Sequence, residues 1–252
     1  MFMTSKQLER ATKLSPWFFL FVLVLSFSTA ATASNGVILF LGDSITAGHG
    51  LDLSQAYPAL IQEKINARGW RFQTVNAGQS GDTSAGGLSR LDWLLKNRVE
   101  ILILELGAND GLRGLPVETT GKNLQRIIDR TREKYPQAKV IIAGMKVPPN
   151  MGRAYGDRFE AMFADLAKQN GAPLIPFVLE GVGGERELNL ADGIHPNAKG
   201  QEIVAANVWK VLEPVLRSIV KSSEARSSKD AWRTISFTKE PTRGFQILRI
   251  SC

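Results

Sequence analysis

Val37-Ile38-Leu39-Phe40-Leu41-Gly42-Asp43-Ser44 is an apolar run that ends directly in a small polar turn. The run does not alternate between apolar and polar residues, as expected for a strand that is buried on both faces. Four later runs have the same character: Phe72–Asn76, Ile101–Leu106, Val140–Ala143 and Leu174–Phe177. Segments with helical spacing of apolar residues separate them. This alternation predicts one α/β domain with a parallel sheet covered by helices on both faces.

The two ends of the chain differ from this pattern. Residues 1–33 have a basic start, an apolar run at Trp17–Phe27 and the small-residue sequence Ala31-Thr32-Ala33. These features predict an export signal that is cleaved, so the protein would be periplasmic or secreted. The alternative is an uncleaved anchor, but the run is shorter than the ~20 residues that span a bilayer. We therefore expect no stable membrane span after cleavage.

The last predicted helix runs from about Ala198 to Ile219, which places the domain at residues 34–220. The segment 221–252 is polar and basic and lacks apolar periodicity, so we expect a disordered extension. Weak strands near Thr234–Phe237 and Gln246–Ile250, or a basic surface-binding tail, are the alternatives.

Charge and cysteine content exclude several classes of function. The net charge of +7 comes from the two ends, because the segment 34–216 is formally neutral. The domain therefore has no basic surface that favours nucleic-acid binding. The one cysteine, Cys252, allows no intrachain disulfide. Together with the two histidines it does not supply the usual ligands of a zinc site, so we expect no metal.

Polar residues gather where four of the predicted strands end. The loops concerned are Gly42-Asp43-Ser44, Asn76–Thr83, Gly107–Gly111 and Asp192–His195. Ligands of such sheets bind at the carboxyl ends of the strands, so these loops are expected to converge on one rim.

The residue types in these loops fit acyl transfer. Ser44 is the candidate nucleophile, His195 its base, and Asp192 the acid that orients the base. The backbone N–H groups of Ser44 and Gly78 and the side-chain amide of Asn109 would hold the oxyanion. Taken singly, each residue has a simpler explanation, such as a helix cap or a turn. The second histidine, His49, has no acid at a comparable spacing and is expected at the rim of the site.

These motifs resemble those of the SGNH (GDSL) hydrolases. Gly-Asp-Ser at 42–44, Gly78, Gly-Ala-Asn-Asp at 107–110 and Asp-x-x-His at 192–195 carry the resemblance. The longer stretches around them are similar to the exported bacterial subgroup of acyl-CoA thioesterases, lysophospholipases and arylesterases. The resemblance implies a flavodoxin-like three-layer α/β/α sandwich with a five-stranded parallel sheet. It also implies action on acyl esters and thioesters without a cofactor.

The same resemblance implies that two loops line the substrate site. Leu112, Leu115 and Pro116 would contact the acyl chain, and Pro149 would lie in the opposite wall. The alternative is ordinary loop packing. The expected partner is a small-molecule acyl ester or thioester, and the protein is expected to be a monomer. A carbohydrate O-acetyl esterase or acetyltransferase using the same site, and a lipid carrier without turnover, are the alternative functions.

Overall fold

The computed structural model describes residues 36–237, with side chains described up to residue 226. Its centre is a five-stranded parallel sheet with the order β2-β1-β3-β4-β5. The strands coincide with the five apolar runs, so the predicted parallel α/β fold is confirmed. They are β1 (Gly36–Gly42), β2 (Phe72–Gly78), β3 (Ile101–Glu105), β4 (Lys139–Ala143) and β5 (Leu174–Ile175). The last strand is shorter than predicted because Pro176, which has no N–H for the ladder, follows it directly.

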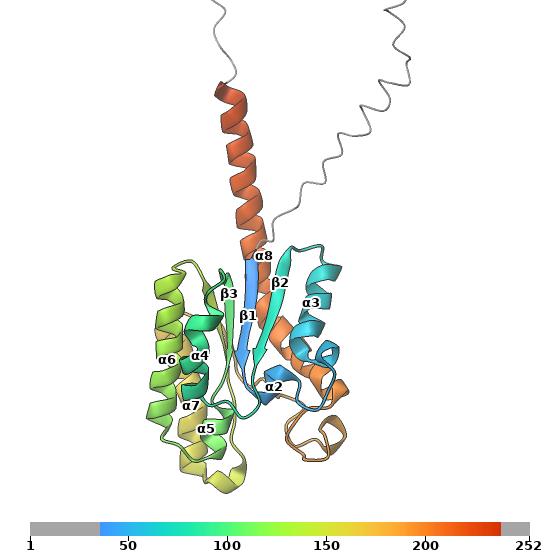
Figure 1. The fold of residues 1–252 in the computed structure, drawn as a ribbon, viewed down its shortest axis with the longest axis vertical. Coiled ribbons are helices and arrows are strands. Elements are labelled where there is room, and N and C mark those ends of the chain that lie inside the picture. The colour runs from blue at the N-terminus through green and yellow to red at the C-terminus, as the bar shows by residue number, and fades with distance from the viewer. Residues whose placement is uncertain (1–35, 238–252) are drawn as a thin grey trace, which may run out of the picture. The chain divides into compact units, whose positions relative to one another are not determined.

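Helices cover both faces of the sheet and make three layers (Figure 1). One face carries α3 (Tyr57–Ala67) and α8 (Ala198–Phe237), and the other carries α4 (Ser84–Leu94), α6 (Val117–Lys134) and α7 (Arg153–Asn170). This distribution follows from right-handed crossovers, because the chain moves from β1 to β2 in one direction and from β2 to β3 in the other. The short helices are α2 (Ser44–Ala47), α5 (Ala108–Leu112), η1 (Leu53–Gln55), η2 (Pro149–Met151) and η3 (Arg186–Leu188).

The middle of the sheet forms the core. Residues 38–41 of β1 and 101–104 of β3 are at most 2% exposed. Burial of each such side chain contributes roughly 1.5–3 kcal/mol, which explains why these strands do not alternate between apolar and polar residues. Phe40 packs edge-on against Tyr57 of α3, with ring centroids 5.5 Å apart.

The reversal of strand order places a crevice at the carboxyl end of β1. The chain leaves β1 through α3 on one face and enters β3 from α4 on the other, so the loops after β1 and β3 diverge. This is where ligands of doubly wound sheets bind. Ser44 lies two residues after the end of β1.

Helix α8 continues to Phe237, beyond the end near Ile219 that the periodicity predicts. The structure therefore has helix where weak strand pairing at Thr234–Phe237 was the alternative. The side chains of α8 that pack against the core reach Val220, and residues 221–226 are mostly exposed. The predicted export signal and the end of the C-terminal extension lie outside the described residues. Within 36–237, no helix combines the length and apolar character that crossing a bilayer requires.

Candidate active site

The turn after β1 holds Ser44 in a tightly packed position. The Asp43 side chain accepts a hydrogen bond from Ile45 N (2.9 Å) and so caps α2. A Cβ added to Gly42 would come within 2.0 Å of Thr46 Oγ1. The turn therefore requires glycine at this position for lack of space, and Ser44 is held with its side chain directed to the site.

Ser44, His195 and Asp192 form a continuous hydrogen-bonded chain. The Ser44 Oγ and His195 Nε2 atoms are 2.9 Å apart, and His195 Nδ1 is 2.7 Å from Asp192 Oδ2. The other oxygen of Asp192 accepts from the backbone N–H groups of His195 (3.0 Å) and Ile194 (2.9 Å). These bonds, led by the one from the His195 backbone, hold the pKa of Asp192 well below its ordinary value. Asp192 is thus ionised and fixed against the His195 ring.

Backbone pairing holds the loop that carries these two side chains. Leu190 N donates to His195 O at 2.7 Å, and Asn189 forms an antiparallel bridge with Pro196. Asn197 Oδ1 then accepts from Gly200 N (3.1 Å) at the start of α8. The flanks of the loop from Asp192 to His195 are therefore paired with each other, and its C-terminal flank is tied to the beginning of α8.

The two other oxyanion candidates lie next to the Ser44 turn. A Cβ on Gly78 would come within 2.2 Å of Ala47 N, so Gly78 packs directly on the backbone of α2. Its N–H donates to Asn76 Oδ1 (2.9 Å), and a bound oxyanion would have to replace that partner. Asn109 Nδ2 donates one hydrogen to Asp43 Oδ2 (3.2 Å), which leaves the second amide hydrogen for a ligand.

Asp110 fixes the helix that carries Asn109. Its carboxylate accepts from both N (2.8 Å) and Oγ (2.6 Å) of Ser84, at the start of α4. It also accepts from Thr120 Oγ1 (3.2 Å) of α6. Because three elements meet at this buried carboxylate, α5 has little freedom to move, and Asn109 is held in place.

A second acid, Glu105, lies buried beneath the nucleophile turn. Its Oε2 accepts from Thr46 Oγ1 (2.7 Å) and from Asp43 N (3.3 Å), while its buried Oε1 has no hydrogen-bond partner. Tyr57 OH lies 2.8 Å from Thr46 Oγ1 and closes the group. Burial raises the pKa of Glu105 well above its ordinary value, and burial likewise raises the pKa of Asp43 to about 6.

Sequence reasoning did not identify Glu105 or Arg90 as parts of the site. Arg90 pairs with Asp82 (2.7 Å) and donates from Nη2 to Gly42 O (3.0 Å), which ties α4 to the end of β1. The available signal for Glu105 was a charged residue inside the apolar run 101–106. Arg90 has no such signal, because an arginine on an amphipathic helix is ordinary.

The two loops predicted to line the substrate site lie side by side. Tyr155 OH donates to Leu115 O (2.8 Å), and a Cβ on Gly111 would meet Val147 Cγ1 at 2.5 Å. Leu112 is 45% exposed, and Pro116 and Pro149 are exposed as well. Apolar side chains are therefore available to a ligand on the side of β3 and β4, where Asn109 also lies.

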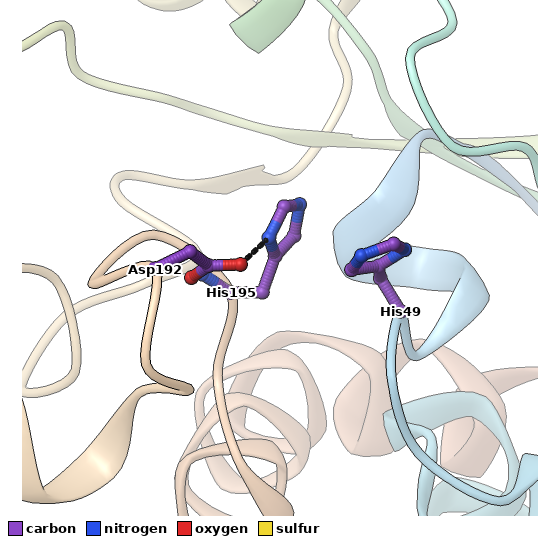
Figure 2. Close-up of side chains that lie close together, drawn as sticks. All are labelled: His49, Asp192 and His195. Carbon is purple, nitrogen blue, oxygen red and sulfur yellow. Dashed lines mark hydrogen bonds and ion pairs between the residues drawn. The ribbon is translucent and has the colours of Figure 1, made fainter.

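His49 lies next to His195, as Figure 2 shows. The ring centroids of His49 and His195 are 4.4 Å apart with an angle of 42° between the planes. His49 Nδ1 is 3.3 Å from Ser80 Oγ in the loop after β2. The side chain is exposed, in agreement with its expected place at the rim.

Comparison with known proteins agrees with this arrangement. A model of the GDSL-like lipase/acylhydrolase family matches residues 40–203, from the end of β1 to the first turns of α8. The chain belongs to this family. Family members are also its structural neighbours, and the protein is a hydrolase that acts on ester bonds.

Two relatives are similar to this protein over most of its chain. The esterase TesA of Pseudomonas aeruginosa is 42% identical over 185 residues, which are 73% of this chain and 91% of that protein. The thioesterase 1/protease 1/lysophospholipase L1 of Escherichia coli K12 is 39% identical over 201 residues, 79% of this chain and 92% of that protein.

Solved structures of GDSL relatives share the fold. A crystal structure of TesA superposes with a TM-score of 0.68 at 42% identity and covers 71% of this chain and 98% of its own. The esterase EstA from Pseudoalteromonas, inhibited by monoethylphosphonate, has a TM-score of 0.68 at 32% identity and covers 72% and 99%.

Proposed function

We propose that this protein is an exported serine hydrolase that cleaves acyl esters and thioesters through an acyl-enzyme on Ser44. The observation that carries the proposal is the hydrogen-bonded chain from Ser44 Oγ through His195 to Asp192. It is supported by the names of the relatives, which include an esterase, a thioesterase/lysophospholipase and an arylesterase.

In the first half of the reaction, Ser44 Oγ attacks the carbonyl carbon of the ester or thioester. His195 Nε2, 2.9 Å away, accepts the hydroxyl proton as the bond forms. Asp192 holds the other ring nitrogen and stabilises the imidazolium. Negative charge develops on the carbonyl oxygen, where Ser44 N–H, Gly78 N–H and the free amide hydrogen of Asn109 would donate.

The tetrahedral intermediate then collapses. His195 gives the proton to the leaving group, which is the oxygen of an alcohol or the sulfur of a thiol. An acyl-enzyme on Ser44 remains. In the second half, water replaces the leaving group, loses a proton to His195 and attacks the acyl carbon. Collapse of this second intermediate releases the acid and restores the Ser44 hydroxyl.

The acyl chain would lie along Leu112, Leu115, Pro116 and Pro149, which line the side of the site next to Asn109. Export by the segment 1–33 and action as a monomer without a metal or cofactor are part of the same proposal. Residues 1–33 have the basic, apolar and small-residue regions of a signal, and nothing in the proposed chemistry needs a second subunit.

The test is loss of the nucleophile. Ser44→Ala is expected to lower kcat for hydrolysis of p-nitrophenyl acyl esters by ~10⁴ or more, because no other group can form the acyl-enzyme. A fluorophosphonate probe should label the wild type on Ser44 and leave the variant unlabelled. Ser80→Ala, in a neighbouring exposed loop, is the control and should keep both labelling and turnover. Retained turnover in Ser44→Ala with an unchanged circular dichroism spectrum would contradict the proposal.

A further inference from the structure

The two histidines of the chain and one carboxylate form a group of metal-ligating side chains at the mouth of the site. His49, Asp192 and His195 each offer one ligand atom, and these atoms lie within 4.8 Å of one another. His49 and Asp192 are exposed, and the His195 side chain is 20% exposed. Figure 2 shows His49 on the segment after α2, facing the loop that carries the other two. Solvent ions therefore have direct access to the group.

We propose that this group binds Zn²⁺ reversibly and that the bound ion inhibits hydrolysis. Zn²⁺ takes imidazole nitrogens and carboxylate oxygens at about 2.0–2.2 Å in a tetrahedron, so its ligand atoms lie roughly 3.4 Å apart. The ligand atoms are at most 4.8 Å apart, so the widest pair must close by up to roughly 1.4 Å to reach that geometry. Rotation of the exposed His49 side chain can supply most of this movement, and water takes the fourth position.

The surroundings of the group favour a metal over simple ring packing. Ser80 Oγ, 3.3 Å from His49 Nδ1, is the kind of partner that orients a ligating imidazole. Asp192 Oδ1 keeps its two backbone donors, and Oδ2 uses one lone pair on His195 Nδ1 (2.7 Å) and keeps the other for an ion. Two imidazoles and one carboxylate are a ligand set that Zn²⁺ prefers and that Mg²⁺ and Ca²⁺ do not.

Inhibition follows from the identity of the ligands. An ion on His195 Nε2 occupies the lone pair that takes the Ser44 proton. An ion on Nδ1 displaces the hydrogen bond with Asp192, which fixes the ring. Either mode removes the base, so bound zinc and turnover exclude each other. The inhibition rests on the proposed role of His195, whereas zinc binding itself does not.

The experiment compares the purified, tag-free protein with His49→Phe and His49→Gln. Phenylalanine keeps an aromatic ring beside His195 without a ligand atom, and glutamine keeps polarity without an imidazole. Asp52→Asn, which removes a carboxylate of the same loop from outside the group, is the matched control. Zn²⁺ is titrated against p-nitrophenyl ester hydrolysis in a non-chelating buffer, and binding is measured in parallel by isothermal titration calorimetry.

We expect one Zn²⁺ per wild-type chain, inhibition that EDTA reverses, and no inhibition by Mg²⁺. Both His49 variants should hydrolyse the ester normally without zinc, and their zinc affinity and inhibition should weaken by roughly 10–100-fold or more. Asp52→Asn should behave as the wild type. Equal inhibition of the His49 variants and the wild type, or no zinc binding by the wild type in calorimetry, would overturn the inference. If the wild type did not hydrolyse the ester, calorimetry of the wild type and the His49 variants would still show whether zinc binds at His49.

Discussion

Among single residues, the least expected feature is the pair of buried carboxyl groups of Asp43 and Glu105, in and beneath the turn that carries Ser44. Glu105 is 1% exposed and accepts from both Thr46 and Asp43 N. The sequence points to Ser44, Asp192 and His195 because they lie in polar loops, where a functional residue stands out. Glu105 lies in a strand, where its charge inside an apolar run marks it as unusual, but its partners Asp43 and Thr46 are about 60 residues away in the chain and the local sequence does not identify them.

The raised pKa of Glu105 predicts that this side chain lowers the stability of the folded protein more as the pH rises. The unfolded chain loses the proton near the ordinary value of 4.5, while burial keeps it on the folded protein to a higher pH. Wild-type stability is therefore lost as pH rises above that value, by at most about 1.4 kcal/mol per pH unit. The glutamine in Glu105→Gln does not titrate. The free energy of unfolding of the variant, relative to that of the wild type, should therefore increase from pH 5 to pH 8. Urea unfolding of both proteins at the two pH values measures this difference.

Glu118→Gln is the control for this prediction. Glu118 is exposed, and hydrogen bonds from its own backbone N–H and from Arg158 lower its pKa. It is ionised in the folded and unfolded chain throughout pH 5–8, so the difference from the wild type should stay flat. A flat difference for Glu105→Gln as well would show that the buried acid ionises freely in the folded state.

Among the helices and strands, α8 connects the turn that carries Ser44 with the loop that carries His195. Gln201, in the first turn of α8, is 1% exposed; it accepts from Tyr57 N (2.9 Å) and donates to Ile45 O (3.1 Å). The same helix begins three residues after His195. The position of its first turn therefore affects both sides of the Ser44–His195 hydrogen bond.

Gln201→Leu is expected to weaken both stability and activity. The change leaves the buried Tyr57 N–H without its partner and removes one of the two donors to the Ile45 carbonyl, which still accepts from Gly48 N; the cost is roughly 1–3 kcal/mol. It also releases the turn that follows Ser44, so kcat/KM should fall while the protein is still folded. Urea unfolding and ester hydrolysis measure the two effects.

Glu202→Leu, at the next, exposed position of α8, is the matched control and should change stability by less than about 0.5 kcal/mol. Full kcat/KM in a destabilised Gln201→Leu would mean that α8 supports the fold without positioning Ser44.

The elements themselves were largely predictable. Buried apolar runs marked the central strands clearly, whereas β2 is partly polar and exposed; the family model covers the same region. The ends of helices and strands were harder to predict, as the continuation of α8 from Ile219 to Phe237 shows. Periodicity reports only the part of a helix that packs on a core, and residues 221–226 have little core to pack on.

For the protein as a whole, the hydrolase domain should be independent of the extension beyond Val220. Among the side chains described up to residue 226, Leu216 is the last of α8 that is fully buried, and Ile219 and Val220 are partly buried against the core. A chain that ends after Val220 is therefore expected to keep its Tm within about 2 °C and its full kcat/KM. Differential scanning calorimetry and ester hydrolysis test this expectation.

A chain that ends after Leu212 provides the comparison. It loses Leu216 and the partly buried Val215 and Ile219, so its Tm should fall by several degrees, roughly 4 °C for each kcal/mol lost. A large loss of Tm already in the chain that ends after Val220 would mean that the extension stabilises the domain.

Asp192 and His195 occupy one short loop, whereas the Ser44 hydroxyl lies 151 residues before His195 in the chain. A refolding chain can therefore orient the imidazole of His195 through local bonds alone, before the two ends of the domain have met. Turnover begins only when β1 and the start of α8 come together. The rate at which hydrolysis returns during refolding therefore reports when β1 and the start of α8 meet. It can be compared with the rate at which the helix signal returns in the same sample.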